Sequence, residues 1–427
     1  MTVGDGTAGG SAGPARQVVL GVAGGIAAYK AVELLRLLTE SGHQVRVVPT
    51  ESALRFVGAP TWAALSGQPV SPDVWDDVSS VPHVRIGQAA DLVLVAPATA
   101  DLLARTAAGR ADDLLAATLL TARCPVVFVP AMHTEMWEHP ATQANVATLR
   151  ARGALVVEPA VGRLTGADSG KGRLPEPSEI ALLAELVLRG TGGAAGAGPH
   201  WPDLAGRHVV VSAGGTREHL DPVRFLGNRS SGRQGVALAR TALARGAEVT
   251  LVAANLAVPE PAGVKVIRVV SAEDLRAAVL AAGADADAVV MAAAVADFRP
   301  VERQLSKIKK SDDDPAPLAL ERTADVLAEI SGLRRRPGQV VVGFAAETGD
   351  AAGDVLAHGR AKLARKGCDL LVVNEVGDHL GFETADNAGV VLGADGSQTV
   401  VPRGPKEALA AVVWDLVAAR LPAAARS

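Results

Sequence analysis

Short runs of apolar, mostly β-branched residues recur along the chain, and longer segments with the apolar spacing of helices lie between them. The runs of the first half are VVLGVA, QVRVVPT, DLVLVAPAT, CPVVFVP and ALVVEPA, and those of the second half are HVVVSAG, EVTLVAA, VKVIRVV, DAVVMAAAV, QVVVGFAAE and DLLVVNEV. Strands that are apolar on both faces and alternate with helices are typical of a parallel sheet covered on both sides. The pattern predicts an α/β fold with two doubly wound parallel-sheet domains.

A glycine- and alanine-rich tract, GTGGAAGAGP at Gly190 to Pro199, separates the two sets of strands. Its composition is typical of a flexible coil. The 427 residues are enough for two domains of roughly 200 residues, each with an ordinary core. We therefore expect a first domain over residues 16–189, a linker over 190–202 and a second domain over 203–422.

Each half opens with an apolar run and a glycine-rich turn, in RQVVLGVAGGIAAYK and in RHVVVSAGGTREHLDPVRF. In doubly wound sheets ligands bind at the carboxyl ends of strands, and a glycine turn lets backbone N–H groups approach an anion. We expect one phosphate-bearing ligand in each half. The strand ends at which we expect these ligands are Gly24-Gly25, Pro97 to Asp101, Pro130 to Met136, Gly214 to Arg217, Ala294 to Phe298 and Phe344 to Thr348.

The glycine turns do not match the dinucleotide-binding fingerprint. Neither turn spells GxGxxG, and the second strand of each half ends in Thr50 or Asn255, where an acid that binds the ribose is expected. This pattern disfavours an NAD(P)-dependent oxidoreductase, which stays as an alternative.

Composition narrows the class of protein further. The net charge is −4 and aromatic residues make up 3%, which argues against a nucleic-acid partner and favours a small-molecule enzyme. No apolar run approaches the roughly 18 residues that span a bilayer, and the N-terminal segment lacks the apolar core of a signal peptide. We expect a cytoplasmic protein without membrane contact, in which Cys124 and Cys368 are buried free thiols.

Several motifs together resemble one family. GVAGGIAAYK, PHVRIGQAADLVLVAPATADLLAR, PAMHTEMW, DPVRFLGNRSSGRQG, AAAVADFRP, KIKK and VGFAAET follow one another from about Gln17 to about Leu421 in the order and spacing of the bifunctional coenzyme A biosynthesis enzymes of bacteria. Such enzymes fuse a phosphopantothenoylcysteine decarboxylase to a phosphopantothenate–cysteine ligase. The resemblance implies a flavodoxin-like flavin domain followed by a Rossmann-like ligase domain.

The resemblance also implies two reactions and their partners. In the second half, CTP activates 4′-phosphopantothenate as an acyl-cytidylate, which the amine of cysteine attacks, with Mg²⁺ accompanying the nucleotide. In the first half, FMN assists the decarboxylation of 4′-phosphopantothenoylcysteine to 4′-phosphopantetheine by oxidising the thiol-bearing carbon for a time. A homo-oligomer is implied, with trimer-based flavin domains and paired ligase domains. The sequence does not identify protein ligands for a metal.

Three residues of the second half carry the implied ligase chemistry. By spacing alone, Lys307 in KIKK fits a solvated loop, Asn228 a helix cap and Asp297 a turn. The resemblance instead places Lys307 at the reacting carboxylate and phosphate, Asn228 on the acyl-cytidylate, and Asp297 on the cytosine or ribose. It adds substrate donors at Ser230, Ser231 and Gly232, and nucleotide contacts at Met291, Ala292, Ala293, Ala324, Asp325, Val326, Leu327, Phe344, Lys362 and Lys366. Thr323-Ala324 depart from the asparagine-proline that the family has before Asp325.

For the first half, the resemblance implies a flavin site and a catalytic histidine. The implied FMN contacts are Gly24, Gly25, Ile26, Thr50, Pro97, Ala98 and Thr99. His83 matches the catalytic histidine, and its imidazole can accept or place a proton near neutral pH, although a lone histidine is more often structural.

Two departures concern substrate binding in the first half. PAMHTEMW has His133 after Met132 where the family has asparagine, and a histidine can also donate a hydrogen bond to a carboxylate. His133, Glu135 and His139 do not spell HExxH, which argues against zinc. The second departure lies in the lid, residues 161–177, which we expect to be a mobile loop. It has Thr165 near the place of the family's proton-donating cysteine.

The missing cysteine leaves three interpretations of the first domain. Asp168 or a water supplies the proton, the reaction stops at an enethiol, or the domain serves only as a scaffold for oligomerisation. We favour the first interpretation, because the other motifs of the domain are present and the ligase product needs decarboxylation. Loss of one proton donor typically slows a reaction by about 10² to 10⁴ and does not abolish it.

Overall fold

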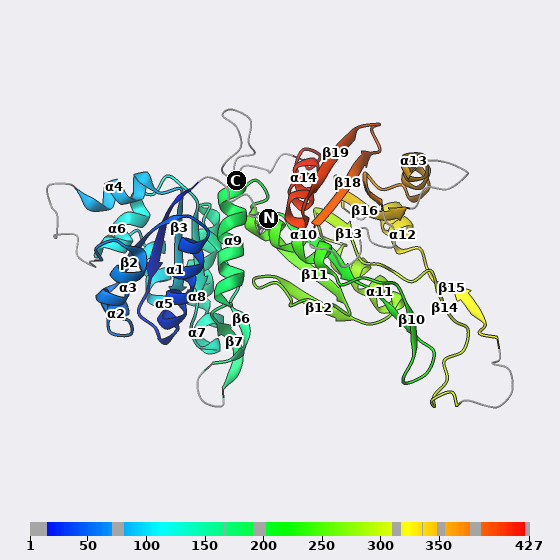
Figure 1. Cartoon of the computed structure of the whole chain (residues 1–427), viewed down its shortest axis with the longest axis horizontal. Helices are drawn as coiled ribbons and strands as arrows, with labels where there is room; N and C mark the ends of the chain where they lie inside the picture. Colours follow the sequence, from blue (N-terminus) through cyan, green and yellow to red (C-terminus); the bar gives the residue numbers. More distant parts are fainter. Residues whose placement is uncertain are drawn as a thin grey trace, which may run out of the picture. The chain divides into compact units, whose positions relative to one another are not determined.

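The computed structural model describes residues 15–70, 81–164, 168–190, 202–309, 317–334, 336–347, 355–375 and 386–422. The chain divides into two compact units, residues 1–201 and 202–427, and each is built around one sheet (Figure 1). Most of the expected linker lies outside the described residues. Among the described residues, no helix has both the length and the apolar character needed to cross a membrane.

The first unit contains a five-stranded parallel sheet. Its strands are β1 (Gln17–Val22), β2 (Gln44–Pro49), β3 (Leu92–Ala98), β4 (Val126–Pro130) and β5 (Leu155–Val156), in the order β2-β1-β3-β4-β5. This is the strand order of the flavodoxin-like fold, in which the chain changes direction between β1 and β3. The predicted flavodoxin-like fold is confirmed. Continuous apolar strands form because both faces of the sheet are covered, and β3 is buried along its whole length.

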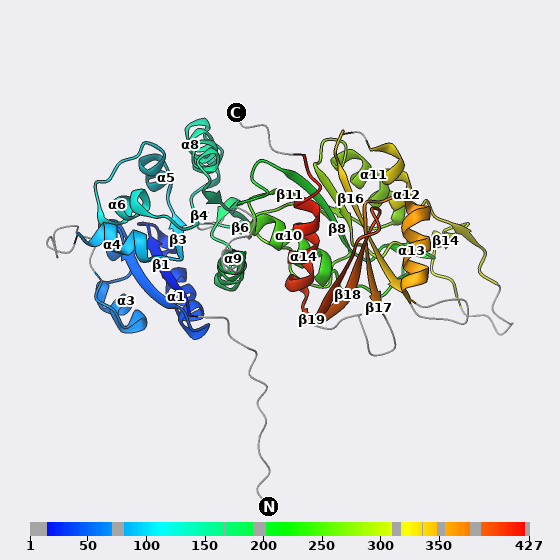
Figure 2. The ribbon, with the colours of Figure 1, turned by 90° about the horizontal axis from the view of Figure 1, so that it is seen from above.

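Helices cover both faces of this sheet. They are η1 (Ile26–Tyr29), α1 (Lys30–Glu40), α2 (Glu51–Leu54), α3 (Ala59–Ser66), α4 (Pro82–Ala89), α5 (Ala100–Ala107), α6 (Leu114–Thr121), α7 (Thr134–Glu138), α8 (Pro140–Ala151) and α9 (Pro177–Gly190). Helices α1, α3 and α9 lie on one face and α4, α5, α6 and α8 on the other (Figure 2). The core between α4–α8 and the sheet includes Phe128 and Trp137.

The segment expected to be a mobile lid loop contains strands. β6 (Ala160–Arg163) and β7 (Ser169–Arg173) pair as an antiparallel hairpin, with Leu164 N–H donating to Asp168 O at 2.8 Å. The expectation of a loop without regular structure was wrong for these two strands. Thr165 lies outside the described residues.

The second unit contains an eight-stranded sheet. Its strands are β8 (His208–Gly214), β11 (Glu248–Ala254), β12 (Lys265–Val269), β13 (Ala288–Met291), β16 (Val340–Glu347), β17 (Leu370–Glu375), β18 (Asp386–Gly393) and β19 (Gln398–Pro405). The order is β12-β11-β8-β13-β16-β17-β18-β19. The first six strands are parallel and have the Rossmann order 3-2-1-4-5-6. The predicted Rossmann-like domain is confirmed, but β18 and β19 are antiparallel additions, so the sheet is mixed rather than wholly parallel.

Helices again cover both faces. α10 (Arg233–Ala244) and α14 (Lys406–Ala418) lie on one face, and α11 (Ala272–Ala282), α12 (Val326–Leu333) and α13 (Val355–Lys366) on the other (Figure 2). Two short antiparallel ribbons project from the carboxyl edge of the sheet. One pairs β9 (Arg217–His219) with β10 (Phe225–Gly227), and the other pairs β14 (Phe298–Pro300) with β15 (Leu320–Arg322).

Candidate active sites

The carboxyl ends of β1, β2 and β3 meet at one edge of the first sheet. Ala23 N–H donates to Pro97 O at 3.1 Å, and Thr50 N–H donates to Val22 O at 2.9 Å. The side chains of Thr50 and Thr99 cap α2 and α5, because they accept hydrogen bonds from the N–H groups of Ala53 and Leu102. The structure therefore brings together all seven residues expected at the flavin.

Space at this edge suits a flat, partly apolar group. A Cβ on Gly24 would lie 2.3 Å from Ser52 Cβ, so only glycine lets α2 approach the end of β1 so closely. A Cβ on Gly25 would meet only the Thr99 methyl group, at 3.6 Å. The Ile26 side chain is 70% exposed beside this turn. An exposed apolar side chain beside a backbone turn with free space around it would be better buried against the rings of a flavin than left in water.

His83 is the second residue of α4, after Pro82. Thr121 Oγ1 donates to His83 O at 2.8 Å and thereby holds the start of α4 against α6. The Nδ1 atom of His83 is buried and has no hydrogen-bond partner among the described residues. A buried polar atom without a partner is rare in proteins, so His83 has a donor or acceptor that the rest of the described chain does not use.

The lid hairpin packs closely against the loop that follows β4. Met132 N–H donates to Gly172 O at 3.0 Å, and a Cβ on Gly172 would lie 2.1 Å from Met132 O. His133 begins α7 as its N-cap residue. Asp168 is exposed directly before β7. The structure therefore brings the two expected substrate-binding residues of PAMHTEMW beside the lid strand.

A small ion-pair network ties the lid hairpin to the sheet. Glu158, just after β5, accepts Lys171 Nζ at 2.6 Å and Arg150 Nη2 at 2.8 Å. Burial raises the pKa of Glu158, but the hydrogen bonds from Lys171 and Arg150 outweigh it, so the pKa lies below the ordinary value of 4.5. Lys171 Nζ also lies 5.9 Å from the centroid of the Trp137 ring. Glu158 is therefore ionised at neutral pH and holds β7 in place.

The remaining candidate groups of the chain are metal-binding side chains and the two cysteines. No group of three or more His, Cys, Asp and Glu side chains is placed to hold a metal ion in the part of the chain that the structure describes. Cys124 is a half-buried free thiol, and burial raises its pKa to about 11. The same holds for the buried Cys368 of the second unit, whose pKa is also raised by burial to about 11. Both thiols are free, as expected, although Cys124 is only half-buried.

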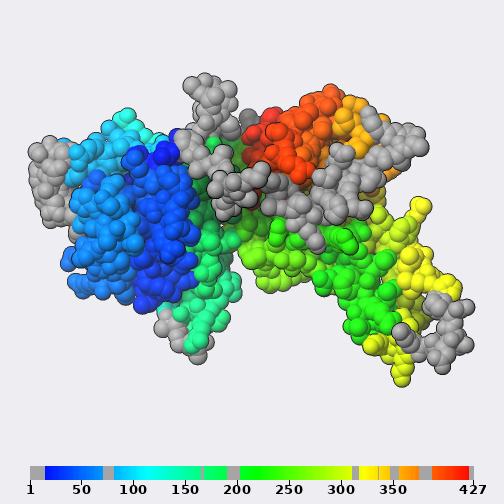
Figure 3. Space-filling model, in the orientation of Figure 1, coloured from blue at the N-terminus to red at the C-terminus, as the bar shows by residue number. Residues whose placement is uncertain are grey.

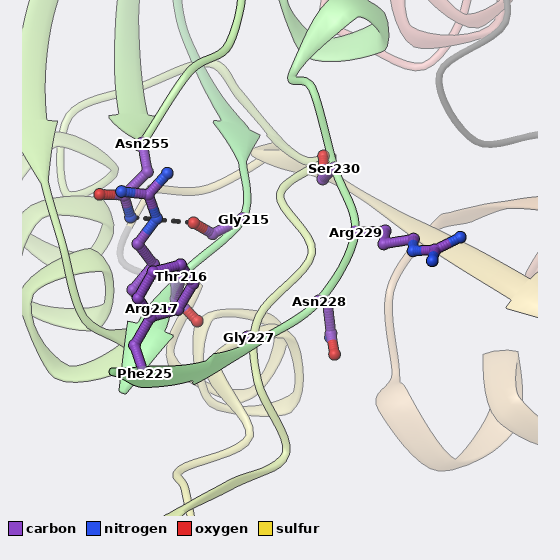
Figure 4. A pocket seen from close by; sticks show the side chains of 9 residues that line it. All are labelled: Gly215, Thr216, Arg217, Phe225, Gly227, Asn228, Arg229, Ser230 and Asn255. Atoms are coloured by element: carbon purple, nitrogen blue, oxygen red, sulfur yellow. Dashed lines mark hydrogen bonds between the residues drawn. The ribbon is translucent and has the colours of Figure 1, made fainter. Parts of the chain in front are cut away.

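The second candidate site begins at a tight turn after β8. Gly214 has φ +89°, and a Cβ there would lie 1.9 Å from Ala254 O, so no other residue fits. Gly215 N–H donates to Ala254 O at 2.9 Å. Asn255 adopts φ +48°, and its Nδ2 donates to Gly215 O at 2.9 Å and to Val270 O at 3.0 Å (Figure 4). These bonds lock the ends of β8 and β11 together.

A pocket of about 210 Å³ opens beside this turn. Its lining residues come from the turn, the β9–β10 ribbon and the segment after it: Gly215, Thr216, Arg217, Phe225, Gly227, Asn228, Arg229, Ser230 and Asn255 (Figure 4). The Arg217 guanidinium lies 4.7 Å from the centroid of the Phe225 ring. The pocket thus combines positive charge, backbone donors and one aromatic face, which suits a phosphate-bearing ligand.

Asn228 connects this pocket to the loop after β13. Its Nδ2 donates to Val295 O at 3.0 Å. The N-cap of α10 is Gly232, with φ +81°, so the interpretation of Asn228 as a helix cap was wrong. Ser230 Oγ accepts the Gly232 N–H at 3.3 Å, and Ser231 O accepts the N–H of Ala257. The expected substrate donors therefore lie together between β10 and α10.

Side-chain hydroxyl groups hold the loop from Met291 to Asp297. Thr216 Oγ1 accepts the Ala296 N–H at 2.9 Å, and Ser212 Oγ accepts the Ala293 N–H at 3.1 Å. On the other side, Thr323 N–H donates to Asp297 O at 3.0 Å and Thr323 Oγ1 donates to Ala296 O at 2.5 Å. Thr323 thus has a defined role at the position where the sequence departs from the family pattern.

Asp325 and Lys366 form an ion pair at the start of α12. Asp325 caps this helix by accepting the Ala328 N–H at 3.1 Å. Burial raises the pKa of Asp325, but the hydrogen bonds from Lys366 and Ala328 prevail and lower it. The other expected nucleotide contacts differ in exposure: Ala324 is exposed, Val326 is buried, and Leu327 and Phe344 are half-buried. Lys362 lies on α13, the helix that also carries Lys366.

Lys307 lies in an exposed segment after β14. Its side chain forms no hydrogen bond or ion pair with another described residue. The structure therefore does not join Lys307 directly to Asn228 or Asp297. Lys310, the last lysine of KIKK, lies outside the described residues.

Thr216 and Arg217 lie within the strand end Gly214 to Arg217, where a ligand was expected, but the sequence assigned them no individual role. Phe225 in the pocket, Asn255 between two strand ends and Thr323 beside the loop from Met291 to Asp297 were not expected to act at this site. One signal was present in the sequence: an asparagine that ends an apolar strand is a residue type that tolerates positive φ.

The strand orders and the groups gathered at the strand ends define a class of protein, a two-domain α/β enzyme with one site in each domain. Two family models match the chain: "DNA/pantothenate metabolism flavoprotein C-terminal domain" over residues 204–421 and "Flavoprotein" over residues 10–186. The coenzyme A biosynthesis bifunctional protein CoaBC of Mycolicibacterium smegmatis (strain ATCC 700084 / mc(2)155) is 61% identical over 413 residues, covering 95% of this chain and 98% of the relative.

A second relative matches over a similar length of the chain. The protein of the same name from Mycobacterium tuberculosis (strain ATCC 25618 / H37Rv) is 60% identical over 408 residues, covering 94% of this chain and 96% of the relative. A crystal structure of the C-terminal domain of such a CoaBC protein is 31% identical, covers 51% of this chain and 97% of that chain, and gives a TM-score of 0.43. The chain belongs to the family of coenzyme A biosynthesis bifunctional proteins. It is a flavoprotein enzyme that catalyses a ligation and a decarboxylation step of coenzyme A biosynthesis.

Proposed function

We propose that the second domain joins cysteine to 4′-phosphopantothenate in a CTP-dependent reaction. The carboxylate of 4′-phosphopantothenate attacks the α-phosphorus of CTP, pyrophosphate leaves, and the amine of cysteine then displaces CMP from the acyl-cytidylate. The hydrogen bond from Asn228 to Val295 O carries this proposal, because it joins the pocket beside β8 to the loop after β13. Two anionic reactants can then meet where backbone N–H groups and positive side chains converge.

Each expected residue has a role in this reaction. The Lys307 ammonium group offsets charge at the reacting carboxylate and phosphate, and the Asn228 amide binds the acyl-cytidylate. Asp297 recognises the cytosine or ribose. Ser230, Ser231 and Gly232 donate to the anionic substrate. The nucleotide contacts named above surround the base and triphosphate, and Mg²⁺ enters bound to the phosphates of CTP.

The test measures pyrophosphate release by the purified full-length protein with CTP. Release is expected only when 4′-phosphopantothenate is present, and addition of cysteine should yield 4′-phosphopantothenoylcysteine. The same assay with NAD(P)H in place of CTP serves as the comparison for the oxidoreductase alternative. Absence of pyrophosphate with both substrates present would contradict the proposal.

In the first domain, the strand ends of β1, β2 and β3 hold FMN, with the seven residues named above in contact with it. When bound, the flavin supplies reversible oxidation of the thiol-bearing carbon, which makes loss of CO₂ easy. His83 accepts or places the proton at that centre, consistent with its unused buried Nδ1 atom. Met132 and His133 bind the substrate carboxylate beside the lid.

Asp168 donates the proton in the last step, in which the enethiol is reduced to 4′-phosphopantetheine and the reduced flavin, when bound, would supply the hydride. Its exposed position directly before β7, in the docked lid hairpin, supports this role. The test follows CO₂ and thiol products of 4′-phosphopantothenoylcysteine by mass spectrometry in wild type, Asp168→Asn and Thr165→Cys. Asp168→Asn is expected to accumulate enethiol and Thr165→Cys to relieve that accumulation in the double variant. Unchanged 4′-phosphopantetheine formation by Asp168→Asn would assign the proton to water.

The enzyme acts in the cytoplasm as a homo-oligomer, in which flavin domains associate as trimers and ligase domains as dimers. Light scattering of the full chain tests the assembly. Trimeric flavin domains and dimeric ligase domains together require a number of protomers that is a multiple of both three and two. A monomer at micromolar concentration would exclude it.

A further inference from the structure

The tip of the β9–β10 ribbon contains a completely buried carboxylate. The Asp221 side chain is 0% exposed. Its Oδ1 accepts hydrogen bonds from the N–H groups of Val223 and Arg224, each at 2.7 Å, and these bonds close the turn of the ribbon. Its Oδ2 accepts the N–H of Ile308 at 3.2 Å. One oxygen therefore shapes the turn, and the other binds a segment 87 residues further along the chain.

Further contacts hold the same distant segment. Arg224 Nη2 donates to Ile308 O at 3.3 Å, and Gln304 N–H donates to Leu220 O at 2.9 Å. Arg224 Nη1 also lies 3.7 Å from Asp221 Oδ2. Figure 3 shows the green ribbon and the yellow segment against each other. The N–H and the carbonyl oxygen of Ile308 are therefore both hydrogen-bonded to the ribbon, although the segment itself is exposed.

This arrangement concerns Lys307, which directly precedes Ile308. The Lys307 side chain has no partner among the described residues, so the backbone alone sets the point from which this flexible side chain extends and the space that its ammonium group can reach. The ribbon that carries Asp221 continues through β10 into Asn228. We infer that Asp221 is a positioning residue that holds Lys307 in a fixed place relative to Asn228 for the ligase reaction. The inference rests on the proposed function of Lys307.

The carboxylate suits this role because both of its oxygens only accept hydrogen bonds. Burial raises the pKa of Asp221, while the N–H groups of Val223, Arg224 and Ile308 and the Arg224 charge lower it and prevail. An asparagine can keep its Oδ1 on the turn, but its NH₂ group then faces the Ile308 N–H. Two donors repel each other there, so an amide leaves the Ile308 N–H without a partner.

The experiment compares Asp221→Asn with Asp274→Asn in the full chain. Asp274 is the matched control, because its carboxylate also accepts backbone N–H groups, in the capping box of α11, but binds no part of the Lys307 segment. Hydrogen exchange of peptides that differ by residue 308 reports on the Ile308 N–H. Pyrophosphate release gives kcat and the KM for CTP.

Asp221→Asn is expected to lower the exchange protection of Ile308 by about tenfold or more, and kcat by a similar factor, with the KM for CTP changed by less than about threefold. Asp274→Asn is expected to change neither quantity. Unchanged protection of Ile308, or lost protection with unchanged kcat, would overturn the inference. Wild-type protein that releases no pyrophosphate would contradict the proposed function instead, while the exchange result would still report on Asp221.

A second pair of variants covers the case in which Asp221→Asn does not fold. Ile308→Pro removes the N–H that Asp221 accepts and also restrains the backbone at residues 307 and 308, in an exposed segment outside the core. Leu305→Pro is its control, since Leu305 is 93% exposed and its N–H has no described partner. Ile308→Pro is expected to reduce kcat by about tenfold and Leu305→Pro by less than about twofold. Equal effects of the two prolines would overturn the inference.

Discussion

Thr323 holds the loop before Asp297 at the position where the family has an asparagine-proline motif and this chain has Thr323-Ala324. Its N–H and Oγ1 donate to two consecutive carbonyl groups, Asp297 O and Ala296 O. Together with Thr216 on the other side, it fixes the loop that carries Asp297. The loop is therefore held by hydrogen bonds that Thr323 donates and Thr216 accepts, rather than by a rigid proline.

Replacement of the Thr323 hydroxyl should weaken nucleotide binding. Thr323→Val keeps the N–H bond to Asp297 O and the side-chain shape but loses the bond to Ala296 O, which costs about 1 kcal/mol. The KM for CTP is therefore expected to rise about fivefold, measured by pyrophosphate release. Thr323→Ser keeps the hydroxyl and serves as control. A serine variant as impaired as the valine variant would show that the hydroxyl is not the cause.

Single residues were predictable where they stand at strand ends. Gly24 and Thr99 were expected together because parallel strands bring their carboxyl ends to one edge, and the resemblance added Thr50. The structure has all three at that edge. Asp221 and Thr323 were not found, because each acts through a backbone group of a residue distant in sequence. Such a partner depends on how the ribbons fold over the sheet, which a pattern of apolar positions does not specify.

At the scale of elements, the lid hairpin depends on glycines in β7. A Cβ on Gly172 would meet backbone atoms of Met132 at 2.1 Å, whereas a Cβ on Gly162 would meet only the flexible Arg173 side chain, at 3.3 Å. An alanine at Gly172 must move the hairpin away from the loop after β4, whereas an alanine at Gly162 need not.

Gly172→Ala is therefore expected to lower kcat/KM for decarboxylation by about tenfold or more, because the lid no longer docks beside Met132. CO₂ release measures the effect. Gly162→Ala, in the same hairpin, should stay within about twofold of wild type. Similar losses in both variants would mean that backbone entropy rather than docking sets the rate.

The docking of the lid should also depend on pH. Glu158 has a folded-state pKa below 4.5, so its stabilising contribution is present above that pH and is lost as the pH falls through the lowered folded pKa. Hydrogen exchange of β7, corrected for intrinsic rates, should show constant protection from pH 7 to about pH 5 and a loss below about pH 4. In Glu158→Gln the protection should be lower at neutral pH and flat over this range. An identical pH profile in both proteins would exclude Glu158 as the cause.

Elements with continuous apolar runs were predicted well, and the others were missed. The parallel strands β3 and β8 are buried on both faces and stand out in the sequence. β19 is largely exposed, and β7 (SGKGR) has no apolar residue. Such strands form because a neighbouring strand supplies hydrogen bonds, and this cause leaves no apolar pattern in the chain.

At the scale of the whole molecule, the two domains should work independently. Lys307→Gln is expected to lower pyrophosphate release by about 10² or more, because it removes a positive charge from the ligase site. Decarboxylation of supplied 4′-phosphopantothenoylcysteine should remain within about twofold of wild type, since each unit has its own sheet and core. CO₂ release by the same preparation is the measurement. Loss of both activities in this single variant would show that the domains are coupled.

The strand orders of the two sheets also bear on the ancestry of the chain. Both halves repeat the same alternation of apolar strands and glycine turns, which suggests an internal duplication. A duplicated gene would have copied the connections between strands together with the sequence pattern. The first sheet has the order 2-1-3-4-5 and the second has 3-2-1-4-5-6. The chain therefore crosses to the other side of its first strand after two strands in the first half and after three in the second. A duplication that preserved these connections therefore does not account for both sheets, and the likeness of the two halves lies in the alternation of strands, glycine turns and helices that any doubly wound sheet requires.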